Sequence, residues 1–106
     1  AVFAKYSRDD EKEADEDGVR LVGRAGISPL GVPEMLQKLL DERKSSPGGV
    51  DSWFRSHPYE EERIQYTRVL IDRNFKERLG TLTRDTPLYQ GFRARVKGLP
   101  PATKAK

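Results

Sequence analysis

The chain has 106 residues, no cysteine, 35% charged residues and a formal net charge of +3. A chain of this length folds as one domain with a modest core, and the lack of cysteine excludes disulfides and thiolate metal sites. No apolar run approaches the roughly 20 residues that cross a bilayer, and no basic-then-apolar leader opens the chain, so we expect neither a membrane span nor a secretion signal.

The first predicted helix runs from about Tyr6 to Ala25. Its small and apolar positions recur at steps of three and four and predict one stripe, made of Glu11, Ala14, Gly18, Leu21, Val22 and Ala25. Gly26 predicts the end of this helix, and Ser28 with Pro29 predicts a capping hydroxyl and a first-turn proline for the next.

Two further helices follow, with no strand-like alternation between them. The second ends near Lys44 and has the apolar set Val32, Met35, Leu36, Leu39 and Leu40, and the segment KSSPGGVDS at residues 44–52 breaks it. The third, from about Pro58 to Leu79, opens with three glutamates and has the pattern Ile64, Thr67, Leu70, Ile71, Phe75 and Leu79. We therefore predict an all-α fold with three main helices joined by loops.

Beyond Gly80 the chain becomes basic. It predicts a short helix at about 88–96 and a loosely ordered basic tail. We place the helical domain at residues 1–80 and a C-terminal extension with a flexible end at residues 81–106.

The acidic stretch at residues 7–18 holds seven carboxylates and raises the question of a metal site. A calcium loop starting at Glu13 fails, because its twelfth position is Arg24 where a bidentate glutamate is required. Glu11 and Asp15 lie four residues apart and share the face that leads into the small apolar stripe. Buried carboxylates need a partner, so this placement predicts a nearby cation. The remaining acids of the stretch are interpreted as solvated surface.

Four ordered phrases resemble the HtpX-like and CAAX-prenyl-protease-like zinc metallopeptidases, especially their soluble or lipid-anchored periplasmic members. The first phrase matches at Arg8, Glu11, Ala14, Asp15 and Gly18 and continues through VRLVGRAGISP. The others are GVPEMLQKLL, FRSHPYEEERI and DTPLYQGFRARVKGLP. The resemblance covers nearly the whole chain.

The resemblance implies a zinc endopeptidase that binds one zinc ion and cleaves polypeptides in the bacterial cell envelope, as a periplasmic or membrane-associated protein. It makes Glu11 the third zinc ligand and Asp15 an acid that orients a metal-bound histidine. The chain has one histidine and no H-E-x-x-H, which departs from the family pattern. We therefore expect the C-terminal half of a catalytic domain, inactive alone, whose partner is the N-terminal half of the same domain.

His57 and Arg63 are the candidate catalytic residues within the third phrase. His57 alone reads as a cap or loop residue, and the resemblance adds the roles of metal ligand or substrate contact. Arg63 alone reads as a surface cation, and the resemblance makes it a partner for Asp15 or for a substrate carbonyl. Trp53, Phe54 and Tyr59 are interpreted as edges of the core.

Two other interpretations remain open. A basic strip with two aromatic rings could bind nucleic acid or an anionic membrane, and it comprises Arg84, Tyr89, Phe92, Arg93, Arg95, Lys97, Lys104 and Lys106. The strip is short, terminal and unpatterned, so we expect no nucleic acid partner. The chain could also be a non-catalytic helical interaction module that docks a partner along Ala14 and Gly18.

Overall fold

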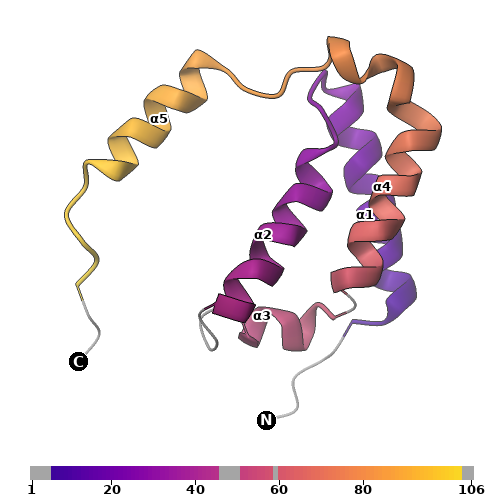
Figure 1. Cartoon of the computed structure of the whole chain (residues 1–106), viewed down its shortest axis with the longest axis horizontal. Coiled ribbons are helices and arrows are strands. Elements are labelled where there is room, and N and C mark those ends of the chain that lie inside the picture. The colour runs from indigo at the N-terminus through magenta and orange to yellow at the C-terminus, as the bar shows by residue number, and fades with distance from the viewer. Residues whose placement is uncertain (1–5, 46–50, 59, 104–106) are drawn as a thin grey trace.

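The structure is a computed structural model that describes residues 6–45, 51–58 and 60–103, the side chains of residues 51 and 52 excepted. Its elements are α1 (Arg8–Arg24), α2 (Gly31–Ser45), α3 (Asp51–Ser56), α4 (Glu60–Phe75), the 3-10 helix η1 (Lys76–Thr81) and α5 (Pro87–Lys97). Figure 1 shows α1, α2 and α4 side by side, with α3 near the end where α1 begins and α5 set apart. The all-α prediction is confirmed for the described residues. Five α-helices occur there, because α3 adds one that was not expected and the expected short C-terminal helix is α5.

Both ends of α1 are closed by local hydrogen bonds that the sequence encodes. At the start, the Ser7 hydroxyl accepts from the Asp10 amide at 3.0 Å, and the Asp10 carboxylate accepts from the Ser7 amide at 3.2 Å. At the end, Gly26 has a φ of 82°, and the Ile27 amide donates back to the Val22 carbonyl. The prediction that Gly26 ends this helix is confirmed.

The buried face of α1 differs in part from the predicted stripe. Its buried residues are Glu11, Asp15, Val19 and Gly23, a set spaced by four. Glu11 and Asp15 are buried as predicted, whereas Ala14, Leu21 and Ala25 are exposed. The helix carries two interleaved sets of small and apolar residues, and α4 packs against the set that contains the carboxylates.

Two small hydrophobic clusters hold the bundle together, and α4 contributes to both. The cluster nearer α3 consists of Leu36, Leu40, Phe54 and Ile64, and the cluster nearer η1 consists of Val19, Ile71 and Phe75. Of the six periodic positions of the third predicted helix, Ile64, Thr67, Ile71 and Phe75 are buried and Leu70 and Leu79 are partly buried. The helix predicted to reach Leu79 ends at Phe75, and Leu79 lies in η1. Met35 is the exception in α2, because it is half exposed rather than in the core.

The α1–α2 loop is tied to the segment after η1 by a short parallel bridge between Ile27 and Thr83. The Thr83 amide donates to the Gly26 carbonyl at 2.9 Å, and the Ser28 amide donates to the Thr83 carbonyl at 2.8 Å. The prediction that the Ser28 hydroxyl caps α2 is wrong, because this buried oxygen has no hydrogen-bond partner among the described residues. The main chain of Ser28 is held by the bridge instead.

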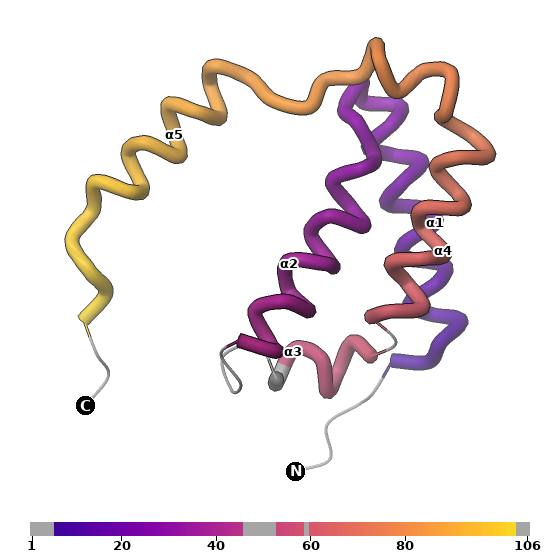
Figure 2. The backbone as a smooth tube through the Cα atoms, viewed as in Figure 1, coloured from indigo at the N-terminus to yellow at the C-terminus, as the bar shows by residue number. Residues whose placement is uncertain are grey.

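The short C-terminal helix expected at about 88–96 is present as α5. Figure 2 shows an extended segment leading from η1 to α5, away from the bundle. Thr86 caps the helix by accepting from the Tyr89 amide at 3.0 Å, Pro87 lies in the first turn, and Gly98 is the C-cap. Lys104, Lys106, Tyr59 and most of the break between α2 and α3 lie outside the described residues.

Candidate functional site

The fold brings all four predicted site residues together where α1, α3 and α4 meet. Glu11 and Asp15 come from the first two turns of α1, Arg63 comes from the first turn of α4, and His57 directly follows α3. Glu11 is 4% exposed, Asp15 is 6% exposed and Arg63 is 9% exposed. The cation that these buried carboxylates require is therefore Arg63, which lies 48 residues from Asp15 in sequence.

Arg63 binds Asp15 through two parallel hydrogen bonds. Its Nε lies 2.8 Å from Asp15 Oδ2, and its Nη2 lies 2.7 Å from Asp15 Oδ1. The hydrogen bond to Asp15 raises the pKa of Arg63, against an opposing effect of burial. Asp15 is thus paired with a permanent cation, which is one of the two roles that the resemblance implies for Arg63. Both Asp15 oxygens accept from Arg63, whereas the resemblance implies that Asp15 orients a metal-bound histidine.

The same guanidinium also reaches Glu11. Arg63 Nη1 lies 3.1 Å from Glu11 Oε2, although Nη1 makes no hydrogen bond of good geometry. The attraction between the two groups is therefore mainly one of charge. One guanidinium compensates two buried carboxylates stacked one turn apart on α1.

The other oxygen of Glu11 is bonded to His57. Glu11 Oε1 lies 2.8 Å from His57 Nδ1. An ionised carboxylate only accepts hydrogen bonds, so the proton in this contact belongs to Nδ1. The side chain of His57 is 33% exposed while that of Glu11 is 5% exposed, so the imidazole covers the carboxylate from the solvent side.

Two aromatic residues that the sequence analysis did not place in the site hold the imidazole. The Tyr6 ring stacks on His57 with centroids 5.0 Å apart and planes 12° apart, and Trp53 contacts the same ring at 5.0 Å. The Tyr6 amide also donates to the Ser56 carbonyl at 3.1 Å, which ties the segment before α1 to the end of α3. Only the spacing of Trp53 and His57, one helical turn apart, could have indicated one of these contacts.

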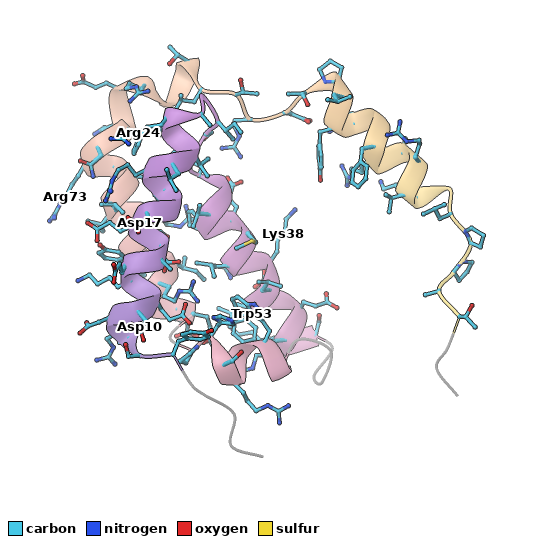
Figure 3. The ribbon with its side chains drawn as sticks, turned by 180° about the vertical axis from the view of Figure 1, so that it is seen from behind. Asp10, Asp17, Arg24, Lys38, Trp53 and Arg73 are labelled. Carbon is cyan, nitrogen blue, oxygen red and sulfur yellow. The ribbon has the colours of Figure 1, made fainter. Side chains whose placement is uncertain are left out.

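An open hollow lies beside Glu11 and His57. Its other lining residues are Tyr6, Asp10, Glu13, Ala14 and Asp17. Figure 3 shows Asp10 and Asp17 along α1 and Trp53 at the end of the bundle where α1 begins. Three of the predicted surface acids, Asp10, Glu13 and Asp17, thus line the hollow beside Glu11 and its partly exposed partner His57.

The donor atoms at this hollow suit zinc but do not complete a zinc site. Two ligands of a tetrahedral zinc ion, each about 2.0–2.2 Å from the metal, lie roughly 3.3 Å apart. The separation of 2.8 Å between Glu11 Oε1 and His57 Nδ1 is within a small side-chain movement of that value, and zinc would have to displace the proton on Nδ1. Zinc needs at least three protein ligands, and no group of three or more candidate ligands occurs among the described residues.

Comparison with known proteins shows the family of this chain. The profile described as peptidase family M48 matches residues 1–70, which include the four site residues. The chain belongs to peptidase family M48. The resemblance to metallopeptidases is therefore confirmed at the level of the family, whereas the finer HtpX-like or CAAX-protease-like assignment is not settled by this match.

Two relatives of this M48 chain come from Escherichia coli K12. Metalloprotease YcaL is 42% identical over 72 residues, which is 67% of this chain and 27% of YcaL. Beta-barrel assembly-enhancing protease is 32% identical over 63 residues, which is 59% of this chain and 13% of that protein. The chain thus spans about a quarter or less of these relatives. No solved structure gives a significant match.

Wherever the structure describes them, the helices are too short or too polar to cross a bilayer.

Proposed function

We propose that this chain supplies the glutamate ligand of the zinc site in an M48 metalloendopeptidase, with Glu11 as that ligand. The observation that supports this is the placement of the Glu11 carboxylate, which is buried, compensated by Arg63 and bonded on its other oxygen to His57 beside an open hollow. The two histidines of H-E-x-x-H and the glutamate that activates water are absent from the printed sequence. They come, in this proposal, from another part of the full-length protein.

The role proposed for Arg63 and Asp15 is to fix the position of Glu11. All three guanidinium nitrogens of Arg63 lie 2.7–3.1 Å from a carboxylate oxygen of Asp15 or Glu11, and the Arg63 side chain is only 11% exposed. This favours a positioning role over direct contact with a substrate carbonyl. The ion pair with Asp15 fixes the guanidinium, and the guanidinium in turn restrains the Glu11 carboxylate and neutralises part of its charge.

His57 is proposed to cover the solvent-facing side of the Glu11 carboxylate. With its Nδ1 proton donated to Glu11, it holds one carboxylate oxygen in place. Breaking that bond frees both the oxygen and the imidazole. A zinc ion bound at such a site supplies Lewis-acid polarisation of the scissile carbonyl and an activated water.

The substrates and location follow from the family and are proposals for the whole protein. We propose polypeptide substrates and a site of action in the bacterial cell envelope, with residues 1–80 as part of the catalytic domain and residues 81–106 as an extension. The chain alone is proposed to be inactive, because it provides at most two of the zinc ligands.

The decisive experiment changes Glu11 and Glu13 separately in the full-length enzyme. Glu11→Gln should reduce bound zinc, measured by elemental analysis after dialysis, and should abolish peptide cleavage, because an amide is a far poorer zinc ligand than a carboxylate. Glu13→Gln is the matched control, since Glu13 is an exposed acid that lines the same hollow, whereas Glu11 is buried and contacts Arg63 and His57. Equal zinc content in both variants would contradict the assignment of Glu11.

A second experiment separates the roles of His57. If His57 competes with water for the metal, His57→Ala should maintain or increase basal cleavage and loosen selectivity. If it contacts the substrate, catalytic efficiency should fall by roughly 10- to 1000-fold with zinc content unchanged. If His57→Ala lowers the free energy of unfolding by about 1 kcal/mol and leaves the kinetics unchanged, His57 is a structural cap. That result would contradict both the metal-competing role and the substrate-contact role.

A further inference from the structure

Helix α5 presents an apolar face that no described residue covers. None of its residues is buried, and its large apolar side chains are about half exposed or more: Leu88 83%, Tyr89 54%, Phe92 54% and Val96 48%. Leu99, just after the helix, is 65% exposed. An amphipathic helix that keeps such a face in water is typical of a binding element.

The apolar side chains of α5 form one continuous stripe. At about 100° per residue, Leu88, Phe92, Val96 and Tyr89 fall within roughly 100° of arc. The Tyr89 and Phe92 rings are neighbours, with centroids 6.5 Å apart. The stripe is therefore ordered along one side of the helix rather than scattered around it.

The cations of α5 are placed at the edges of this stripe. By the same helical spacing, Arg95 lies about 20° beyond Leu88 on one side, and Arg93 lies about 40° beyond Tyr89 on the other. Lys97 adds a third positive charge, and no acid occurs between residues 87 and 97. Long cationic side chains at the margins of an apolar face can reach phosphates in the plane above that face.

We propose that α5 lies flat on an anionic phospholipid surface, with its apolar stripe in the outer acyl region and Arg93 and Arg95 on lipid phosphates. Charge complementarity selects this partner, because the helix carries only positive charge and a bilayer surface supplies phosphate beside hydrocarbon. A nucleic acid would satisfy the cations and leave the stripe in water. The helix is about 16 Å long, half the roughly 30 Å of a bilayer core, which fits a helix in the interface plane.

The capping of α5 prepares it for such a surface. Thr86, Pro87 and Gly98 define both ends without help from the bundle. An isolated helix of this length is only marginally stable in water. Binding to a lipid surface should therefore increase its helicity, and a single short helix should bind reversibly rather than anchor the protein.

Vesicle co-sedimentation of the 106-residue chain tests the proposal. Vesicles of mixed phosphatidylglycerol and phosphatidylcholine should bind the chain at least about 10-fold more tightly than phosphatidylcholine alone, and added salt should weaken this binding. Arg93→Gln with Arg95→Gln should weaken it by about 30-fold. The control, Lys38→Gln with Arg68→Gln, removes the same charge from exposed sites on α2 and α4 and should leave binding within about 3-fold of the unmodified chain.

A second pair of variants tests the apolar stripe. Phe92→Ser with Val96→Ser should abolish vesicle binding, whereas Leu21→Ser, at a residue 62% exposed on α1, should not. Circular dichroism should show that anionic vesicles increase the helicity of the unmodified chain. The same vesicles should not increase the helicity of the α5 variants. The proposal would be overturned if the chain shows no preference for anionic vesicles, or if it binds a DNA duplex in place of vesicles. It would also be overturned if sedimentation velocity shows self-association that the α5 variants abolish, while those variants still bind vesicles.

Discussion

Replacing Arg63 with methionine should destabilise the fold far more than any other single loss of charge among the described residues. The guanidinium makes contacts of 2.7 and 2.8 Å with Asp15 and of 3.1 Å with Glu11, and both carboxylates are at most 6% exposed. Methionine fills most of the same volume, so the main change is electrostatic. Two buried carboxylates would remain one turn apart without a cation.

Removing one partner of a buried ion pair costs about 3–5 kcal/mol. This is a large fraction of the roughly 5–15 kcal/mol that stabilises a typical domain, and it corresponds to a fall in melting temperature of about 12 °C or more. The assay is urea unfolding followed by far-ultraviolet circular dichroism. Arg68→Met, an exposed position on the same helix, should change the free energy of unfolding by less than about 0.5 kcal/mol.

Adding Asp15→Asn to Arg63→Met gives the internal check. Neutralising one stranded carboxylate should recover part of the lost stability, although the same Asp15→Asn change in the unmodified chain should be destabilising. The reasoning would be refuted if Arg63→Met costs no more than Arg68→Met. It would also be refuted if the second substitution destabilises the Arg63→Met chain further.

Three other predictions follow from local contacts. Gly23→Ala should lower the free energy of unfolding by about 1–3 kcal/mol, because the added Cβ would overlap the Phe75 ring. Gly18→Ala, with nothing within 4 Å of the added Cβ, should raise it by about 0.5–1 kcal/mol. A Gly23→Ala chain as stable as the unmodified one would contradict the close packing. Burial and the carboxylate of Glu16 raise the pKa of Tyr66, so its phenol should titrate above the usual value of about 10 when followed by ultraviolet absorbance. Glu16→Gln should lower the pKa of Tyr66. An unchanged Tyr66 titration in that variant would argue against the 3.2 Å contact between Tyr66 and Glu16. The 106-residue chain alone should neither cleave casein nor gain thermal stability from micromolar zinc, and zinc-dependent cleavage by it would contradict the incomplete-site proposal.

The sequence predicted α4 better than α1, for a physical reason. In α4 the positions Ile64, Ile71 and Phe75 recur at helical spacing and could be assigned to the core, although Val69 on the same helix is about half exposed. In α1 two sets of small residues compete, and the set that is buried contains two carboxylates. Its burial depends on Arg63, which no local pattern in α1 reveals.

The parts of the site that could be predicted were those with unusual local chemistry. Two acids on one helical face predicted a nearby cation, and the structure places Arg63 there. The stacking of Tyr6 on His57 could not be predicted, because it depends on how the segment before α1 meets the end of α3. The short α3 was missed as well, since six residues are too few for a periodic pattern.

The bridge between Ile27 and Thr83 lies at the opposite end of the bundle from the Glu11 hollow. It lies just beyond the C-terminal end of α1, and the helix from Glu11 to Arg24 is about 20 Å long. The extended segment to α5 leaves from this far end, as Figure 1 shows. Perturbations of α5 and of the Glu11 carboxylate should therefore be thermodynamically additive, and the protein can meet one partner through α5 while the hollow at Glu11 stays open to another.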